Sequence, residues 1–310
     1  MRQTKRLLCF LLFFYAFPPL SRTGATSRSF VAFAQDASPE DILSPSPNPT
    51  LQEAANQVTE RAKKLGCKSG SCLILVMDFF TSNDATSVAG SQLARDFGLL
   101  LAKPLSPGRV VDATTLKIFQ AEERIPARYF NEADAARWLG GQFRATLVLQ
   151  GSLDLSKSQP TARFVLIDAN AKNKMQQWNV QLPVLSVSPE DLKPSEPFPE
   201  LVPITVDQNG RAVFKPGRGT KPANQPRCTY MPNPNYTDAA RASKFSGAIA
   251  VEAIINADDR LENLRIVKGI PYNLNQSALD VMQSWRCTAG IFDGKPTSTV
   301  VEFEVKFRSY

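Results

Sequence analysis

Cysteine is the residue type in this sequence with the most obvious capacity for chemistry. Cys287 stands in the stretch SWRCTAG, where its thiol could act as a nucleophile, bind a metal or form half of a disulfide. The 310 residues include no histidine, so no imidazole can activate a thiol or a serine or hold a metal ion. Acid–base catalysis would then depend on carboxylates, lysine or tyrosine, and the sequence has no motif that would bring acidic residues together as a catalytic pair. We therefore expect no enzyme, no metal and no cofactor, with a carboxylate or thiol hydrolase as the remaining enzymatic alternative.

The N-terminus has the layout of an export signal. Three basic residues precede the apolar run LLCFLLFFYAFPPL, and AFAQ supplies the small-x-small pattern for cleavage before Gln35. Residues 1–34 are therefore predicted to be a signal peptide. An uncleaved membrane anchor is the alternative, but the run has about 14 apolar residues, whereas a membrane span needs roughly 20.

The net charge of +7 does not indicate binding to nucleic acid. Five of the basic residues lie in the first 34 positions, which contain no acidic residue, and without those five 31 basic residues stand against 29 acidic ones. No basic stripe with interleaved aromatic residues remains in the rest of the chain. A phosphate-binding surface is therefore not predicted.

Export would place Cys67, Cys72, Cys228 and Cys287 in an oxidising compartment. Four cysteines allow three pairings. Cys67 and Cys72 flank a Ser/Gly turn in CKSGSC, which leaves Cys228 to pair with Cys287. The second disulfide would close a loop of about 58 residues and stabilise the fold by about 2–4 kcal/mol. A buried free thiol at Cys287 is the alternative.

The first half of the exported chain alternates helix and strand patterns. Residues 35–50 are rich in Pro and Ser and are predicted to be disordered. Apolar periodicity then predicts four helices, the third of which follows a short strand and is capped by Asp112 or Thr114. The helices are expected at 50–65, at 85–103, in the second part of 108–119 and at 131–143. Apart from the short strand at the start of 108–119, strands are expected at 72–80, 145–155, 161–170 and 174–184. This order predicts an α/β domain with a mixed sheet over residues 51–185.

The motifs of this region resemble envelope domains of the FlgO, CsgG and TolB N-terminal type. That layout has an apolar strand, an amphipathic helix, a V-x-D strand, an A-x-x-L-G helix and a final strand ending in Gly. The residues that match it here are Ala135, Leu139, Gly140, Ala145 and Gly151. The Gly before Ala145 is missing, and Asp78 stands near the apolar pair that usually follows a Pro.

A Pro-rich linker over residues 186–221 precedes a second pattern of elements. PNYTDAARASKF predicts a short helix, GAIAVEAIINADDRLENLRIVKG two strands joined at NADD, and LNQSALDVMQSWRC a helix that closes at Trp285 and Arg286. STVVEFEVKFRSY alternates apolar and charged residues as a strand does. The order α-β-β-α-β predicts a three-stranded antiparallel sheet with two helices on one face over residues 222–310.

This C-terminal pattern resembles the C-terminal domain of TonB energy transducers. Tyr236, Ala240 and Gly247 keep the family's spacing, Trp285-Arg286 keeps its helix end, and VVEFEVKF keeps its last strand. Thr237 replaces the Pro of the family's Tyr-Pro. Asp259 replaces the Gly of the hairpin turn, where Asp is among the better substitutes.

The resemblance implies a binding module that pairs its last strand with an extended peptide of an outer-membrane receptor. The physical basis is strand addition, because an edge strand offers unpaired backbone groups. The alternative is that Glu302, Glu304 and Lys306 form only a solvated face whose charges protect the edge. Trp285 is expected in the core, and Tyr236 either in the core or at the partner. The candidate partner-binding residues are Tyr236, Val300, Val301, Glu302, Phe303, Glu304, Val305, Lys306 and Phe307.

The resemblance and the export signal together predict a periplasmic TonB-like protein linked to TonB-dependent transport. Its expected partner is an outer-membrane TonB-dependent receptor or another envelope protein, and not nucleic acid. Membrane contact is expected only through partners or through an uncleaved N-terminus. If the N-terminus is uncleaved, the alternative localisation applies, in which the protein is anchored in the inner membrane and faces the periplasm. A protein released by cleavage could bind receptors but not pull on them. The alternative function is an envelope structural or assembly adaptor that acts through the N-terminal α/β domain.

Overall fold

The computed structural model describes residues 49–68, 71–82, 85–102, 110–155, 160–183, 187–195, 198–216 and 224–309. The predicted signal peptide and nearly all of the predicted disordered segment lie outside these residues. No helix among the described residues is long and apolar enough to cross a membrane.

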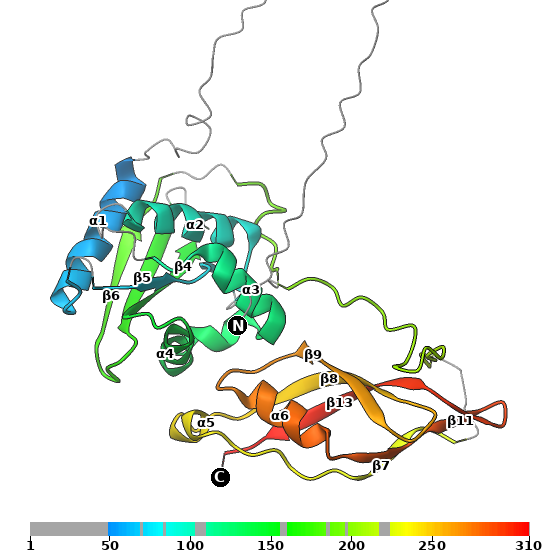
Figure 1. The fold of residues 1–310 in the computed structure, drawn as a ribbon. Coiled ribbons are helices and arrows are strands. Elements are labelled where there is room, and N and C mark those ends of the chain that lie inside the picture. Colours follow the sequence, from blue (N-terminus) through cyan, green and yellow to red (C-terminus); the bar gives the residue numbers. More distant parts are fainter. Residues whose placement is uncertain are drawn as a thin grey trace, which may run out of the picture. The chain divides into compact units, whose positions relative to one another are not determined.

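The N-terminal half contains a mixed sheet with helices on both faces (Figure 1). Its helices are α1 (Pro49–Lys64), α2 (Val88–Ala102), α3 (Ala113–Glu123), the 3-10 helix η1 (Ala127–Asn131) and α4 (Ala133–Gln142). Its strands are β1 (Ile74–Val76), β2 (Phe80–Ser82), β3 (Ala85–Thr86), β4 (Leu147–Asp154), β5 (Thr161–Asp168) and β6 (Met175–Gln181). The strand order is β3-β2-β4-β5-β6, and β1 pairs with β4 in parallel while β5 pairs with its neighbours antiparallel. The predicted α/β class with a mixed sheet is confirmed.

Alternation along β1 explains why helices cover both faces of this sheet. Successive side chains of a strand point to opposite faces. Ile74 and Val76 pack with α1 and α2 in one apolar cluster, whereas Leu75 and Met77 pack with α3 and α4 in another. The continuous apolar run therefore predicts a strand that is buried from both sides.

The strand predicted at 72–80 is broken in the structure. After β1, the backbone N–H of Phe79 donates to the carbonyl oxygen of Gly90 in α2 (3.3 Å) and not to a neighbouring strand. A Cβ at Gly90 would lie 2.1 Å from the Phe79 oxygen, so this close approach requires glycine. The short strand expected before α3 is reduced to a single bridge between Ile74 and Val110. Asp112 caps α3, as predicted, by accepting from the Thr115 N–H (3.1 Å).

The C-terminal half is built on the three-stranded antiparallel sheet β13-β8-β9. Figure 1 shows α6 lying over one face of this sheet. The helices are α5 (Asp238–Ala242) and α6 (Leu274–Met282). The strands are β7 (Arg227–Tyr230), β8 (Gly247–Ile255), β9 (Leu261–Lys268), β10 (Arg286–Thr288), β11 (Gly290–Phe292), β12 (Lys295–Thr297) and β13 (Thr299–Phe307). The predicted three-stranded sheet is confirmed.

The predicted end of the second helix is wrong. α6 ends at Met282, and Arg286 and Cys287 belong to strand β10, which pairs with β7. Arg286 therefore does not cap the helix, and its guanidinium lies 5.6 Å from the ring centre of Tyr230. The helix ends early because of a distant part of the chain. Strand β7 pairs with residues 286–288 and supplies Cys228, the disulfide partner of Cys287.

Residues 205–214 of the Pro-rich segment form a hairpin that we call the clamp. Its strands meet at the Val206–Ala212 bridge, and the turn between them contains Gly210, whose φ of 75° favours glycine. Phe214 then pairs with the start of β13. The clamp therefore belongs structurally to the C-terminal sheet.

Asp207 holds the clamp in place. Its buried carboxylate accepts from the N–H and Nε of Arg211 (2.8 and 2.7 Å) and from the Ser298 hydroxyl (2.7 Å). Arg211 also donates to Asp258 in the β8–β9 turn. Burial alone would raise the pKa of Asp207, but the hydrogen bonds from Ser298 and Arg211 outweigh it and lower this pKa to about 2.

Replacing Asp207 by Asn is expected to lower the free energy of unfolding by about 1–3 kcal/mol at pH 7, because buried donors lose their charged acceptor. The folded pKa lies below the unfolded value, so this contribution is present above about pH 4 and lost as the pH falls toward 2. Denaturant titrations at several pH values measure it. The exposed partner change Asp258→Asn is the control and should destabilise the protein less than Asp207→Asn does, because water screens an exposed ion pair. A difference between wild type and Asp207→Asn that does not shrink below pH 4 contradicts this account.

Candidate functional site

Strand β13 forms one edge of the C-terminal sheet. It pairs with β8 along its whole length, from Thr299 opposite Ile255 to Phe307 opposite Gly247. Val305 and Phe307 are buried, whereas Glu302, Glu304 and Lys306 are exposed on the other face. The predicted alternation of this strand is confirmed.

The backbone groups that face outward from this edge can be identified from one contact. The N–H of Val300 donates to the carbonyl oxygen of Phe214 (3.0 Å), so Val300 points away from β8. Alternate residues of an antiparallel strand direct both backbone groups to the same side. Glu302, Glu304 and Lys306 therefore point outward as well. Within the described residues, no hydrogen bond reaches their outward backbone groups. We call these three residues the free edge.

The clamp occupies the start of the strand. Phe214 donates its N–H to the carbonyl oxygen of Ser298 (2.8 Å) and accepts from Val300, and its ring lies 4.3 Å from that of Phe292. The outward N–H of Val300, one of the predicted docking residues, is thus already used within the chain.

The segment Met231–Tyr236 lies near the other end of β13 and does not pair with it. Pro232 and Pro234 have no N–H to donate to a ladder. The segment is instead held from the helix side, because Trp285 donates its Nε1–H to the carbonyl oxygen of Pro232 (3.3 Å) and Ser277 donates to that of Asn235. The segment therefore leaves the outward groups of β13 unpaired.

Tyr236 and Trp285 both pack against side chains of β13. The rings of Tyr236 and Phe307 lie 6.2 Å apart, and Trp285 meets Phe303 edge to face at 5.3 Å. The Tyr236 hydroxyl is buried, and no hydrogen-bond partner for it is found in the described part of the chain. Burial raises the pKa of Tyr236, so the hydroxyl stays protonated at neutral pH. Thr237, which replaces the family's Pro, caps α5 by accepting from the Ala240 N–H.

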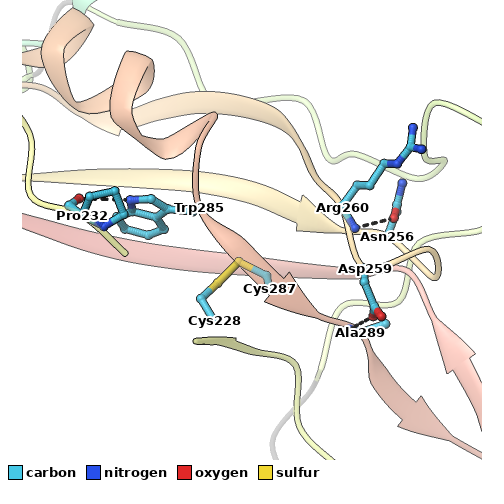
Figure 2. The surroundings of a disulfide bond; sticks show 8 residues. All are labelled: Cys228, Pro232, Asn256, Asp259, Arg260, Trp285, Cys287 and Ala289. Carbon is cyan, nitrogen blue, oxygen red and sulfur yellow. Dashed lines mark hydrogen bonds between the residues drawn. A yellow bond between two sulfur atoms is a disulfide. The ribbon is translucent and has the colours of Figure 1, made fainter. Parts of the chain in front are cut away.

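Both predicted disulfides are present. Cys67 pairs with Cys72, and Cys228 pairs with Cys287. Figure 2 shows the second bond joining β7 to β10. Its sulfur atoms are consumed in this bond, so Cys287 offers neither a nucleophile nor a metal ligand. Of the three roles that its thiol could take, Cys287 therefore has that of a structural crosslink.

Asp259 tolerates the hairpin turn as the sequence predicts. Its φ is 60°, the left-handed region where Asp is less strained than most residues. Its carboxylate also accepts from the Ala289 N–H (2.7 Å), just beyond β10 (Figure 2). The Asp that replaces glycine thus links the hairpin turn to the strand that carries Cys287.

A pocket of about 650 Å³ opens beside the end of β13. We call it the basic pocket, because four of its lining residues are Lys or Arg and none is acidic. Its lining residues are Asn233, Pro234, Tyr236, Arg241, Lys244, Lys306, Phe307, Arg308 and Ser309. Across the residues that the structure describes, no group of three or more metal-binding side chains is found.

Comparison with known proteins gives one family match. Residues 232–309 match the family model "Gram-negative bacterial TonB protein C-terminal", so the resemblance expected for the C-terminal region is confirmed over that span. No curated protein matches the chain.

Solved structures give weaker likenesses. The solution structure of the Pseudomonas aeruginosa TonB C-terminal domain is 21% identical and covers 27% of this chain and 87% of its own, with a TM-score of 0.22. The E. coli LpoB structure is 15% identical and covers 53% and 82%, with a TM-score of 0.33. The LpoB C-terminal domain from Salmonella enterica is 15% identical and covers 44% and 98%, with a TM-score of 0.32. Likenesses of this size carry no function across.

Sequence reasoning missed two parts of the site. The clamp lay in a region interpreted as linker, although Asn209-Gly210 is a common hairpin-turn signal. The cations of the basic pocket come from two distant segments, Arg241 and Lys244 in and just after α5 and Lys306 and Arg308 at the end of β13, and no local motif joins them. The predicted docking residues Val301, Phe303 and Val305 point their backbone groups toward β8 and not outward.

Removing the Cys228–Cys287 bond is expected to destabilise the protein more than removing Cys67–Cys72. The two bonds close loops with sequence separations of 59 and 5, for which loop entropy gives about 4 and 2 kcal/mol. The paired serine variants, Cys228→Ser with Cys287→Ser and Cys67→Ser with Cys72→Ser, are compared by denaturant unfolding. Equal losses, or a larger loss for the short loop, would count against a crosslinking role for the long one.

Proposed function

We propose that this protein is a periplasmic TonB-like binding protein that captures an extended peptide of an envelope partner on the free edge of β13. The observation that carries the proposal is the row of outward backbone groups at Glu302, Glu304 and Lys306, which the clamp and the Met231–Tyr236 segment leave unpaired. Strand addition satisfies such groups directly. The match of residues 232–309 to the TonB C-terminal family supports this use of the edge.

The partner we propose is an outer-membrane TonB-dependent receptor or another envelope protein. The signal-like N-terminus supports export, and the two disulfides fit an oxidising compartment. A direct role in energy transduction for transport would further require an inner-membrane anchor. We also propose the division into a signal peptide (1–34), an α/β domain (51–185), a linker (186–221) whose clamp packs against the sheet of the next domain, and a C-terminal domain (222–310).

The edge charges do not prevent docking in this arrangement. Glu304 and Lys306 pair with each other at 3.0 Å, with both side chains more than half exposed. Their side chains stand on the sheet face, whereas their backbone groups point along the sheet plane. An incoming strand therefore meets the backbone groups without displacing this ion pair.

Replacing Glu304 by Pro removes one outward N–H and is expected to weaken peptide binding about tenfold or more, because one bond of a short ladder is lost and the ring obstructs its neighbours. The matched control is Glu304→Ala, which removes the same charge and keeps the N–H. Fluorescence anisotropy with labelled eight-residue Val/Thr-rich peptides measures binding. The fold should survive, since Pro is tolerated where an N–H faces solvent.

The unfolding temperature of Glu304→Pro shows whether the fold is intact. If the variant is unstable, a peptide with N-methylated backbone amides is tested against wild type instead, because it lacks the N–H groups that donate to the outward carbonyl oxygens of β13 and so loses the complementary hydrogen bonds of the same ladder. Equal binding by Glu304→Pro and Glu304→Ala, or by methylated and unmethylated peptides, refutes strand addition at β13.

A second candidate function is an envelope adaptor that acts through the N-terminal half. The observation that favours it is strand β6, which forms the edge of the N-terminal sheet and carries no charged residue and no Pro along MQQWNVQ. Natural edge strands usually carry such protection. Among the described residues, β6 pairs only with β5, so it too can accept a strand.

Lysines placed on β6 are expected to separate the two candidates. Gln177→Lys with Asn179→Lys adds charges to exposed positions of this edge and should abolish capture of an adaptor partner while leaving peptide binding at β13 unchanged. Affinity capture from envelope extracts, run with the β6 variant and with Glu304→Pro, measures both. Loss of the same partners in Glu304→Pro alone would remove the basis for an adaptor function at β6.

A further inference from the structure

Strand β6 is the last strand of the N-terminal sheet (Figure 1), and two contacts identify which of its backbone groups face outward. Asp168 donates its N–H to the carbonyl oxygen of Lys174 (2.9 Å), and Leu182 donates to that of Pro160 (2.8 Å). The register between these two pairs has no bulge. The even-numbered residues of β6 therefore face β5. The outward residues are the odd-numbered ones, Met175, Gln177, Asn179 and Gln181.

The outer side of β6 is open within the described part of the chain. No hydrogen bond among the described residues reaches the outward N–H and carbonyl groups of these four residues. The open row also has two definite ends. Pro183 has no N–H for the next outward position, and Lys172 and Asn173 lie in the turn back to β5. The open ladder is therefore seven residues long, with Trp178 at its centre.

The composition of β6 favours a second copy of this chain as the occupant of that edge. Two copies related by a two-fold axis present the same surface to each other, so the strand must be compatible with its own sequence reversed. The strand MQQWNVQ contains no charged residue and no Pro, so two copies meet without like charges. Natural edge strands usually carry a charge, a Pro or a bulge against such pairing, and β6 has none of them.

One register brings every outward residue of β6 into a hydrogen-bonded pair. With the two-fold axis at Trp178, Gln177 lies opposite Asn179 of the second copy, and Met175 lies opposite Gln181 of the second copy. Each of these residues then gains a partner for its N–H and for its carbonyl oxygen. A shift of the axis to either side leaves residues at the ends of the ladder unpaired, because the row extends equally far on both sides of Trp178.

The side chains on both faces fit this register. Arg163 of β5 donates to Oε1 of Gln177 (2.7 Å), which leaves Nε2 of Gln177 to donate to Oδ1 of the opposite Asn179. On the other face the two Trp178 side chains are direct neighbours, with Cβ atoms about 4.5–5.5 Å apart. The Nε1–H of Trp178 is buried and has no partner among the described residues. Arg61 of α1 lies over the Trp178 ring (4.4 Å), so its charge stands outside the ladder.

We propose that two copies of this chain pair through β6, antiparallel and about a two-fold axis at Trp178, so that their N-terminal sheets join into one. This assigns β6 an occupant other than the envelope partner of an adaptor. The inference does not depend on peptide binding at β13, so either proposal can fail without the other.

A charge-swap experiment tests the self-pairing. Gln177→Lys with Asn179→Lys places lysines opposite each other and should weaken the dimer about tenfold or more. Gln177→Glu with Asn179→Glu should weaken it in the same way. An equal mixture of the two variants places Lys opposite Glu and should restore dimers. Sedimentation velocity over a range of protein concentrations measures the dissociation constants, and unfolding temperatures show whether each variant is folded.

The matched control is Thr114→Lys with Ile118→Lys, which adds the same charge at exposed positions of α3 and should leave the dimer unchanged. Hydrogen exchange of single amides in wild type gives a second measurement. On dilution below the dissociation constant, the outward N–H groups of Gln177 and Asn179 should lose their protection. The N–H of Trp178, which faces β5 in both states, should keep it.

Every outcome decides for or against the inference. Dimers in wild type that are lost in both charged variants and restored by mixing support it. A wild type that stays monomeric at every concentration refutes it, and so does a lysine variant that dimerises as well as wild type. Charged variants that fold but do not combine on mixing also refute it.

Two further results would assign the edges differently. Glu304→Pro should leave the dimer intact, and if it alone dissociates the dimer, the copies pair through β13 and the inference is refuted. If wild type is monomeric and the lysine variant loses an envelope protein that wild type captures, β6 binds a strand of another protein. That result refutes self-pairing and supports the adaptor.

Discussion

A backbone N–H or carbonyl group that leaves water needs a partner, and β13 has partners along its whole length only on the side of β8, while on its outer side the clamp supplies them only at the start. Its inner groups bond to β8, and this pairing fixes which residues face outward for the whole length of the strand. The contact between Phe214 and Val300 identifies that alternation. This alternation decides which residues lie beside the clamp, on the exposed face and at the basic pocket. If the register of β13 against β8 shifted by one residue, Glu304 would turn toward the core and Phe303 would become exposed.

If β13 accepts a partner strand, as we propose, its exposed backbone groups also risk pairing with the wrong one. In this sheet the risk is reduced at both ends without closing the middle. The clamp covers the start of β13 through Phe214, and the Pro-containing segment before Tyr236 runs near the other end without donating to it. Charged side chains stand on the open stretch between them. The accessible ladder is thereby short, which disfavours long edge-to-edge aggregation.

The sequence predicts those features that depend on local periodicity. The alternation of Val305 and Phe307 with charged residues identified β13, and the substitution of Asp259 for glycine identified a turn with positive φ. Features that depend on distant partners could not be predicted. The clamp is fixed by Asp207 through Ser298, 91 residues away in sequence, and β10 forms because Cys228 and its strand lie opposite Cys287. Likewise, the break after β1 requires Gly90 of a following helix. The start of the Pro-rich segment also makes a contact that no local pattern predicts, because Ser195 donates its N–H to the carbonyl oxygen of the distant residue Thr86 (2.9 Å).

A ladder as short as the free edge supplies affinity but little selectivity. Three outward residues, Glu302, Glu304 and Lys306, offer an N–H and a carbonyl each, and net contributions of about 0.5–1.5 kcal/mol per hydrogen bond depend on the backbone of the partner and not on its side chains. In strand addition, selectivity comes from side-chain contacts beside the ladder. On β13 these contacts are unequal along the strand, because acidic side chains flank the centre and cations without acidic partners lie at the end near Arg308. In the strand addition that we propose, selectivity would therefore come from this uneven distribution of charged side chains and not from the ladder itself.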